Sequence, residues 1–250
     1  MAGRENALGE QTHAILIVGM GGLGVPAASA LARGGAKRLG LADPDPIELS
    51  NLARQVIYGT ASLGRLKVEA AARRIREDYP ALSIDTYPVA LDASNAAQLI
   101  ARHEFVIDAT DDPAVKFLIN DTCLALGRPF VYAGVLGMTG QAMTVLPGRT
   151  ACLRCLFEQP PEPGEIASCR EAGIVGPVAA VIGEIEAAEA LRWLGGGVPE
   201  LAGKILTYDA ALSGRMRTLE VTARAGCACG AARRAESAAA LAAGHNQSSK

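Results

Sequence analysis

The chain is expected to fold as an α/β protein, because short aliphatic, β-branched runs alternate with segments of helical periodicity. Half of its 250 residues are hydrophobic and a fifth are charged, which is enough to bury a large core. A glycine-rich segment follows the first predicted strand directly, as is typical of the first strand-to-helix turn in a doubly wound, Rossmann-like sheet.

Five strands are predicted in the first half, over residues 14–18, 38–42, 83–89, 105–108 and 129–133. Helices are predicted between them, over residues 23–33, 64–77, 93–101 and 114–126. Strands joined through helices pair in parallel. The alternation stops after a strand at 141–146, and a helix at 177–194 precedes strands at 204–208 and 215–221. We therefore expect a parallel first half and added antiparallel strands in the C-terminal half.

The charge balance argues against a nucleic-acid or membrane-surface partner, since 24 Lys and Arg face 26 Asp and Glu, for a net charge of −2. Residues 1–13 are polar and contain no signal-peptide core. Residues 14–32 are uncharged, but four glycines and a proline argue against a membrane helix. Six cysteines, four of them in two close pairs, favour a metal site in the reducing cytoplasm over a disulfide framework.

The glycine-rich loop contains Gly19, Gly21, Gly22 and Gly24. Its backbone N–H groups and the start of the next helix can bind phosphate groups. Asp43, at the end of the second predicted strand, can accept hydrogen bonds from ribose hydroxyls, which fits NAD and ATP equally well.

Charged and polar residues downstream favour ATP chemistry, because displacing pyrophosphate requires cations for the triphosphate and a carboxylate for Mg²⁺. Arg54, Lys67 and Asp111 can supply these groups. The neighbouring candidates for the nucleotide site are Asp45, Ser50, Asn51 and Asp112. Taken singly, Arg54 and Lys67 are also compatible with solvated surface charges, and Asp111 with a helix N-cap ahead of Pro113.

The paired cysteines, Cys152 with Cys155 and Cys227 with Cys229, predict a tetrahedral structural zinc site, a zinc knuckle. Residues 157–168 are rich in Glu, Pro and Gly and are predicted to form an exposed loop, a candidate lid. The Ala-rich tail, 231–250, is expected to be disordered.

The chain resembles the ThiF/MoeB/HesA family, bacterial relatives of ubiquitin-activating E1 enzymes, over about residues 6–230. The motifs that carry the resemblance are the loop 19–24, Asp43-x-Asp45, Ser50-Asn51-Leu52-x-Arg54-Gln55, Gly64-x-x-Lys67, Thr110-Asp111 with Lys116 and Asn120, Gly140-Gln141, Cys152-x-x-Cys155, Cys169-x-x-Ala172-Gly173-Ile174-Val175-Gly176-Pro177 and Tyr208-Asp209-Ala210. The resemblance implies one E1-like adenylation domain over residues 1–230, with a nucleotide-binding half, 13–135, and a carrier- and zinc-binding half, 136–230.

The resemblance also implies the reaction. Family members use MgATP to adenylate the C-terminal Gly-Gly carboxylate of a ubiquitin-like sulfur carrier of the ThiS or MoaD type, releasing pyrophosphate and priming thiocarboxylate formation. Carried over by position, the nucleotide contacts Gly22 and Asp43. The triphosphate lies near Asn51 and Arg54, the α-phosphate beside Lys67, and Mg²⁺ at Asp111.

Further expectations follow from the same resemblance. Cys169 stands where some members form an acyl-disulfide with the carrier, and others do not need the cysteine. A homodimer is expected, with the apolar stretch 178–182 near its interface. The sulfur would come from another protein, a cysteine desulfurase or a rhodanese-like protein, and the product pathway, thiamin or molybdopterin, stays open.

The sequence departs from the family pattern in two places. The second cysteine pair is C-x-C instead of C-x-x-C. The N-terminal Arg-Tyr-x-Arg-Gln pattern, whose arginine reaches the neighbouring subunit's ATP in the family, is not found, so either another positive charge replaces it or catalysis is weaker. Two alternatives therefore stay open, an NAD-dependent Rossmann oxidoreductase and a non-catalytic carrier-binding scaffold.

Overall fold

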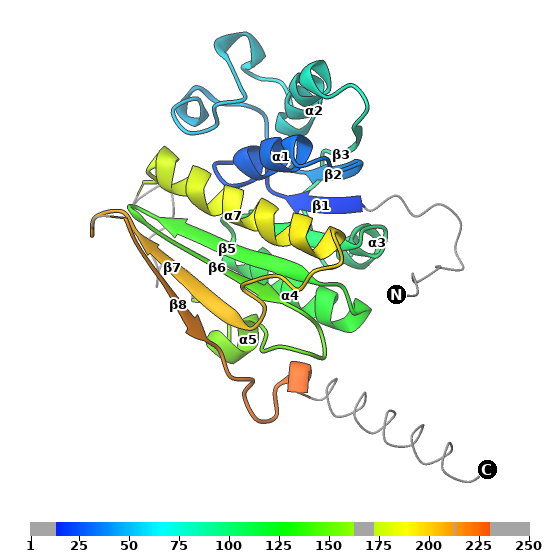
Figure 1. The fold of residues 1–250 in the computed structure, drawn as a ribbon. Coiled ribbons are helices and arrows are strands. Elements are labelled where there is room, and N and C mark those ends of the chain that lie inside the picture. The colour runs from blue at the N-terminus through cyan, green and yellow to red at the C-terminus, as the bar shows by residue number, and fades with distance from the viewer. Residues whose placement is uncertain (1–13, 163–172, 213, 231–250) are drawn as a thin grey trace, which may run out of the picture.

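The computed structural model describes residues 14–162, 173–212 and 214–230. One sheet runs through them with the strand order β3-β2-β1-β4-β5-β6-β7-β8 (Figure 1). The strands are β1 (Ala14–Val18), β2 (Arg38–Ala42), β3 (Ser83–Tyr87), β4 (Phe105–Asp108), β5 (Phe130–Leu136), β6 (Thr139–Val145), β7 (Lys204–Asp209) and β8 (Arg215–Glu220). Strands β1 to β5 pair in parallel and β6 to β8 are antiparallel. The predicted fold class is confirmed.

Helices cover both faces of the sheet. They are α1 (Gly24–Arg33), α2 (Lys67–Asp78), α3 (Ala96–Ala101), α4 (Pro113–Leu126), α5 (Leu153–Leu156) and α7 (Gly176–Leu194), with short 3-10 turns at Leu49–Asn51 and Thr60–Ser62. Helices α1, α2 and α7 pack into one buried cluster, and α3 and α4 into a second cluster on the opposite face. Figure 1 shows α7 lying across strands β5 and β6 beside α1.

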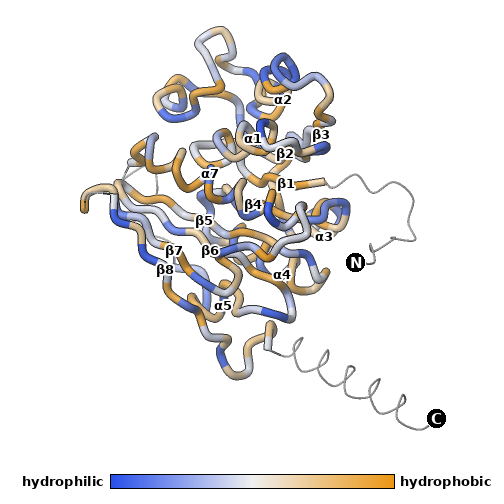
Figure 2. The backbone as a smooth tube through the Cα atoms, in the orientation of Figure 1, coloured by the Kyte–Doolittle hydropathy of each residue, from blue (hydrophilic) through white to orange (hydrophobic). Residues whose placement is uncertain are grey.

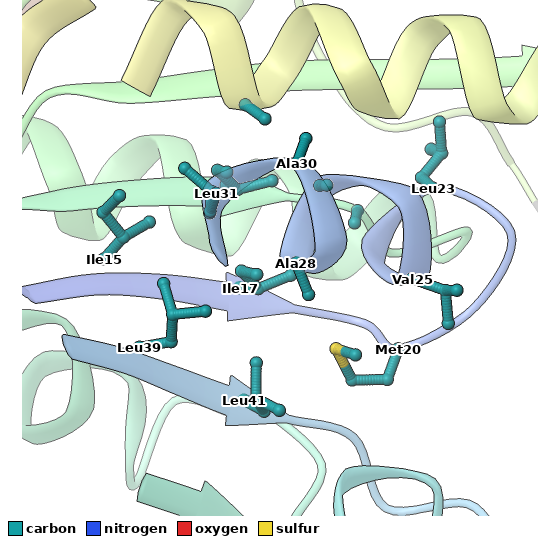
Figure 3. Close-up of a cluster of buried hydrophobic side chains, with 14 of the residues drawn as sticks. Ile15, Ile17, Met20, Leu23, Val25, Ala28, Ala30, Leu31, Leu39 and Leu41 are labelled. Atoms are coloured by element: carbon teal, nitrogen blue, oxygen red, sulfur yellow. The ribbon is translucent and has the colours of Figure 1, made fainter. Parts of the chain in front are cut away.

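Strand β1 is the centre of the core, because all five of its residues are buried. Successive side chains of a strand point to opposite faces. Ile15 and Ile17 join the cluster that contains α1, whereas Leu16 and Val18 join the cluster beneath α4. Figure 3 shows the α1 side of this core, and Figure 2 shows β1 hydrophobic along its length. Burial on both faces explains why this strand is a continuous apolar run.

The predicted strand at 129–133 ends too early. Strand β5 continues to Leu136 and pairs with β6 through a tight turn at Gly137, whose φ is +56°. Gly134 interrupts the apolar pattern, so the sequence predicts that the strand ends there. In the structure the strand continues past Gly134, because its backbone is hydrogen-bonded to β6.

The stretch 178–182 was predicted to lie near a dimer interface, and that placement stays a prediction. Val178, Ala179 and Ile182 are at most 2% exposed and belong to the core around α1. Their apolar character serves packing within the chain. In the described part of the chain, no helix is both long enough and apolar enough to cross a bilayer.

Gly24 should be needed for folding. A Cβ atom at this position would lie 1.8 Å from the carbonyl oxygen of Gly19, which the backbone cannot accommodate without moving. We expect Gly24→Ala to lower the free energy of unfolding by about 3 kcal/mol or more, measured by urea denaturation.

Gly21→Ala is the matched control, because a Cβ there meets nothing closer than Gln55 Nε2 at 3.7 Å. Its free energy of unfolding should stay within about 1 kcal/mol of the parent. Equal stability of the two variants would contradict the packing role of Gly24.

Candidate functional site

A cavity of about 1790 Å³ opens at the carboxyl ends of the parallel strands. It includes the gap between β1 and β4, where the winding direction of the sheet reverses and doubly wound proteins bind ligands. The predicted nucleotide-binding residues that line it are Gly19, Gly21, Gly22, Asp43, Asp45, Ser50, Asn51, Arg54, Lys67, Asp111 and Asp112. Gly24 does not line it and instead packs on the loop backbone.

The glycine loop follows β1, is hydrogen-bonded to the end of β2 and lies against the backbone that follows β4. Gly19, with φ +96°, donates its N–H to the Ala42 carbonyl at 2.7 Å, and a Cβ there would lie 2.6 Å from the Ala109 carbonyl oxygen. Met20 donates its N–H to Asp43 Oδ2 at 2.7 Å. Gly21 and Gly22 face the cavity. Their missing side chains let a phosphate group approach the loop backbone closely.

Asp43 holds the loop and also faces the cavity. Its second oxygen, Oδ1, accepts the Asp45 N–H at 2.8 Å. Burial raises the pKa of Asp43, while Lys67 and the two backbone donors act in the opposite direction. Each carboxylate oxygen accepts one bond from the protein and keeps a lone pair for a ligand hydroxyl.

Lys67 begins helix α2 and is 7% exposed. Its Nζ lies 2.7 Å from Asp45 Oδ2 and 3.6 Å from Asp43 Oδ1. The buried hydroxyl of Tyr58 lies 3.1 Å from the Met20 carbonyl and 3.3 Å from the Lys67 carbonyl, so it links the glycine loop to the start of α2. The ammonium group is thereby held at the cavity wall.

The segment after β2 brings Ser50, Asn51 and Arg54 to the cavity. Asn51 Oδ1 accepts the Glu48 N–H at 3.2 Å, and Arg54 donates to the Ser50 carbonyl at 3.1 Å. A Cβ at Gly22 would lie 3.8 Å from the Arg54 side chain, which places the arginine beside the glycine loop. Its charge can therefore act on phosphate groups bound at the loop.

Gln55 was quoted in the sequence motif but not predicted as a site residue. It is 2% exposed and lines the cavity, and its Oε1 has no hydrogen-bond partner among the described residues. An unpartnered buried oxygen costs free energy unless a ligand or water satisfies it. Its position next to Arg54 in the sequence is the signal that could have identified it.

Two adjacent aspartates at the start of α4, Asp111 and Asp112, have different roles. Asp112 is the N-cap, because its Oδ1 accepts the N–H groups of Ala114 at 2.8 Å and Val115 at 3.4 Å. Asp111 is exposed at the cavity wall, with no hydrogen bond or ion pair to the other described residues. The N-cap role considered for Asp111 thus belongs to Asp112, and Asp111 is free to bind a cation.

Three buried polar residues were not predicted as site residues: Lys116, which lines the cavity, and Asp108 and Glu186 beside it. Lys116 Nζ lies 3.2 Å from Asp108 Oδ1 and 2.5 Å from the Ala133 carbonyl oxygen. Burial raises the pKa of Asp108 to about 6, against the attraction of Lys116. Glu186 of α7 is fully buried, and neither of its oxygens has a partner in the described part of the protein. Only tertiary packing brings these three residues together.

The four predicted zinc ligands meet in space. The sulfur atoms of Cys152, Cys155, Cys227 and Cys229 all lie within 4.8 Å of one another. Zn–S bonds of about 2.3 Å in a tetrahedron separate sulfur atoms by roughly 3.8 Å, so the donor set fits a zinc ion. The C-x-C spacing of the second pair therefore does not prevent convergence.

The cysteine cluster is joined to helix α4. Asn120 accepts the Leu153 N–H at 3.0 Å, and Arg154, between the first two cysteines, makes two contacts of 2.8 Å to Asp121. Arg154 also lies over the Phe117 ring at 4.9 Å. The cluster and the cavity therefore share one helix.

Cys169 and the second half of the predicted loop, residues 163–168, lie outside the described residues, as does the tail from residue 231. In the described half of the loop, residues 157–162, the last three residues line the cavity: Pro160, Pro161 and Glu162.

The fold and the glycine loop define a doubly wound α/β protein with a ligand cavity at its switch point. The sequence model of the ThiF family matches residues 6–231. A sulfur carrier protein adenylyltransferase of Thermus thermophilus is 39% identical over 222 residues, covering 86% of this chain and 82% of that protein. The adenylyltransferase and sulfurtransferase MOCS3 of Sus scrofa is 40% identical over 213 residues, covering 85% of this chain and 47% of MOCS3.

The chain belongs to the ThiF family, as the sequence motifs predicted. It spans about half the length of the MOCS3 relatives. Among solved structures, E. coli MccB with MccA-N7isoASN has a TM-score of 0.78 at 20% identity, covering 87% of this chain and 67% of MccB. The structure of MccB with ATP has a TM-score of 0.75 at 20% identity, covering 86% of this chain and 65% of MccB. These structures share the fold.

The cysteine cluster should bind about one zinc ion per chain. We expect metal analysis to find it in protein purified without chelator, and Cys152→Ser or Cys229→Ser to lose it and to melt at a lower temperature, because binding and folding are coupled. Cys123→Ala, at a buried cysteine outside the cluster, is the control and should keep the metal. Fully stable, zinc-free parent protein would contradict the prediction.

Glu186 should make stability depend on pH. Burial raises its pKa well above the usual value, so the folded chain keeps a proton that the unfolded chain releases. The stability contributed by this proton is present below the unfolded pKa and is lost as the pH rises toward the folded value. We expect Glu186→Gln to raise the urea midpoint at pH 8, with a gain that shrinks toward pH 5.

Glu184→Gln, at an exposed residue of the same helix, is the control and should give no such gain. A Glu186→Gln effect of equal size at both pH values would show that ionisation of Glu186 is not responsible.

Proposed function

We propose that the chain is an ATP-dependent adenylyltransferase that activates the C-terminal Gly-Gly carboxylate of a ubiquitin-like sulfur carrier of the ThiS or MoaD type. The observation that carries the proposal is the grouping of Arg54, Lys67 and Asp111 around one cavity beside the glycine loop. The names of the T. thermophilus and MOCS3 relatives support it.

In the proposed reaction, a carboxylate oxygen of the carrier attacks the α-phosphorus of ATP. The new bond is an acyl-phosphate bond, and the bond from the α-phosphorus to the oxygen bridging to the β-phosphate breaks, so that pyrophosphate leaves with that electron pair. A carboxylate is already deprotonated at neutral pH, so no general base is required. Catalysis then depends on position and on charge stabilisation.

Different residues of the cavity would bind different parts of MgATP. The backbone of Gly21 and Gly22 binds phosphate oxygens, and Asp43 accepts hydrogen bonds from the ribose. Arg54 and Lys67 hold positive charge against the triphosphate, and Asp111 supplies a carboxylate for Mg²⁺. When bound, Mg²⁺ neutralises charge on the departing pyrophosphate.

The remaining expectations belong to the same proposal. Residues 1–230 act as one adenylation domain, with the nucleotide bound in the half 13–135 and the carrier in the half 136–230, where zinc stabilises the cysteine cluster. The protein acts as a homodimer, and a cysteine desulfurase or rhodanese-like protein supplies sulfur, with Cys169 as the thiol for transfer. We also propose a cytoplasmic location, because paired cysteines that suit a metal site favour a reducing compartment.

Removing the charge of Arg54 or of Asp111 should strongly lower adenylation activity. We expect Arg54→Ala and Asp111→Ala each to lower carrier-dependent ATP–pyrophosphate exchange by roughly 10²-fold or more, because each removes a preorganised charge from the phosphate groups. Carriers ending in Gly-Gly are the substrates to test. Arg149→Ala, at an exposed arginine outside the cavity, should exchange at the parent rate.

Asp112→Ala gives a second comparison, because the lost N-cap should cost about 1 kcal/mol of folding stability. Asp111→Ala should leave stability unchanged. Parent-level exchange by either site variant would remove that residue from the proposed mechanism. Tight NAD(H) binding, with no effect of ATP and Mg²⁺ on melting, would favour an oxidoreductase instead.

A further inference from the structure

A buried lysine lies on the cavity wall between the phosphate loop and the antiparallel strands. Lys116 of α4 is 8% exposed and lines the cavity. It bonds to Asp108 at the end of β4 and to the Ala133 carbonyl of β5. The amine therefore stands where β4 and β5 meet, one strand beyond the glycine loop in the sheet order.

The Lys116 amine keeps a donor for a ligand. An ammonium group has three N–H donors, and the two acceptors named above use two of them. The third has no acceptor among the described residues, although the group also lies 5.0 Å from the centre of the Tyr132 ring. A cavity-lining ammonium with a spare donor is suited to an anionic oxygen.

The groups around Lys116 favour its positively charged form. Burial is the largest single influence on the pKa of Lys116 and acts to lower it, but the attraction of Asp108, Tyr132 and Glu186 together outweighs burial and raises the pKa. The other carboxyl group that acts on it from an adjacent element is Glu186 of α7, and burial raises the pKa of Glu186, which favours its neutral form. Asp108 is therefore the one carboxylate that bonds directly to the Lys116 amine among the described residues, and the amine can accept a second anionic partner.

The proposed reaction needs such a cation. The attacking carboxylate and the α-phosphate are both negative, and they repel each other strongly in a cavity of low dielectric constant. Arg54 and Lys67 belong to the segments that follow β2, on the phosphate side of the cavity. The carboxylate needs a positive partner on the opposite side, toward β5 and β6.

We propose that Lys116 is the residue that binds the terminal carboxylate of the carrier during adenylation. This inference rests on the proposed function above. Asp108 and the Ala133 carbonyl fix the direction of the amine, and the carboxylate accepts its remaining N–H. The same contacts also join α4 to β4 and β5, so the experiment must separate binding from a merely structural role.

The test is a coupling experiment between Lys116 and the carboxylate. A carrier that supports exchange with the parent is prepared with its normal Gly-Gly end and with a C-terminal amide, and both are titrated calorimetrically. With the parent, amidation should weaken binding by about tenfold, as for loss of a charge-assisted hydrogen bond. With Lys116→Met, the normal carrier should bind about tenfold more weakly, and amidation should have little further effect.

Three further variants keep the result interpretable. Lys116→Met leaves Asp108 buried without its partner, so Asp108→Asn/Lys116→Met removes both charges together and should give the same loss of coupling. Lys116→Arg should restore part of the preference for the carboxylate. Lys204→Met, at a lysine outside the cavity lining, is the control and should keep the parent preference. ATP affinity should stay within about twofold of the parent in the Lys116 variants, since ATP binds on the other side.

The inference would be overturned if Lys116→Met weakened binding of the normal and the amidated carrier equally, so that amidation had the same effect as in the parent. Lys116 would then have only a structural role. Parent protein that supports exchange but binds both carriers equally would overturn it as well, while the proposed function stands. Parent protein that gives no exchange with any Gly-Gly carrier would overturn the proposed function, and this inference with it.

Discussion

The contact between the first residue of helix α1 and the Gly19 carbonyl is the constraint on which the site depends. The two backbones approach so closely that only glycine fits at position 24. This contact sets the angle at which α1 leaves β1. A second close contact of this kind joins α7 to the start of α1. A Cβ atom at Gly183 of α7 would lie 2.4 Å from the Leu23 carbonyl oxygen. At Gly24 and Gly183, therefore, the packing of the loop, α1 and α7 leaves no space for a side chain.

The central strands of the sheet could be predicted from the sequence because they are buried on both faces. β1, β2 and β4 have the predicted bounds, as continuous apolar runs between turn residues specify strands buried on both faces. The helix starts differ by up to three residues, because a start depends on local hydrogen bonds that hydropathy does not report. Strand β5 extends beyond its predicted end because its partner β6 lies next to it, which is a tertiary effect.

The site was predictable where a motif carries chemistry. The glycine loop, Asp43, Arg54 and Lys67 line one cavity because they follow consecutive parallel strands, whose carboxyl ends meet at one edge. The choice between Asp111 and Asp112 as N-cap depends on backbone direction and needed the structure. Glu186 lies 70 residues or more from Asp108 and Lys116 in the sequence, and its position in a helix of mainly apolar composition gave no sign of their proximity.

Helix α4 connects the two chemical centres of the molecule. Asp112 caps its first turn at the cavity, while Asn120 and Asp121 in its second half hold the segment that carries Cys152 and Cys155. The helix is therefore held at its first turn and near its middle, so the segment between these two points cannot open without releasing one of them. The backbone amides of α4 should therefore exchange with solvent as one cooperative unit, and the opening of that unit would release the cysteine cluster and the cavity wall in the same event.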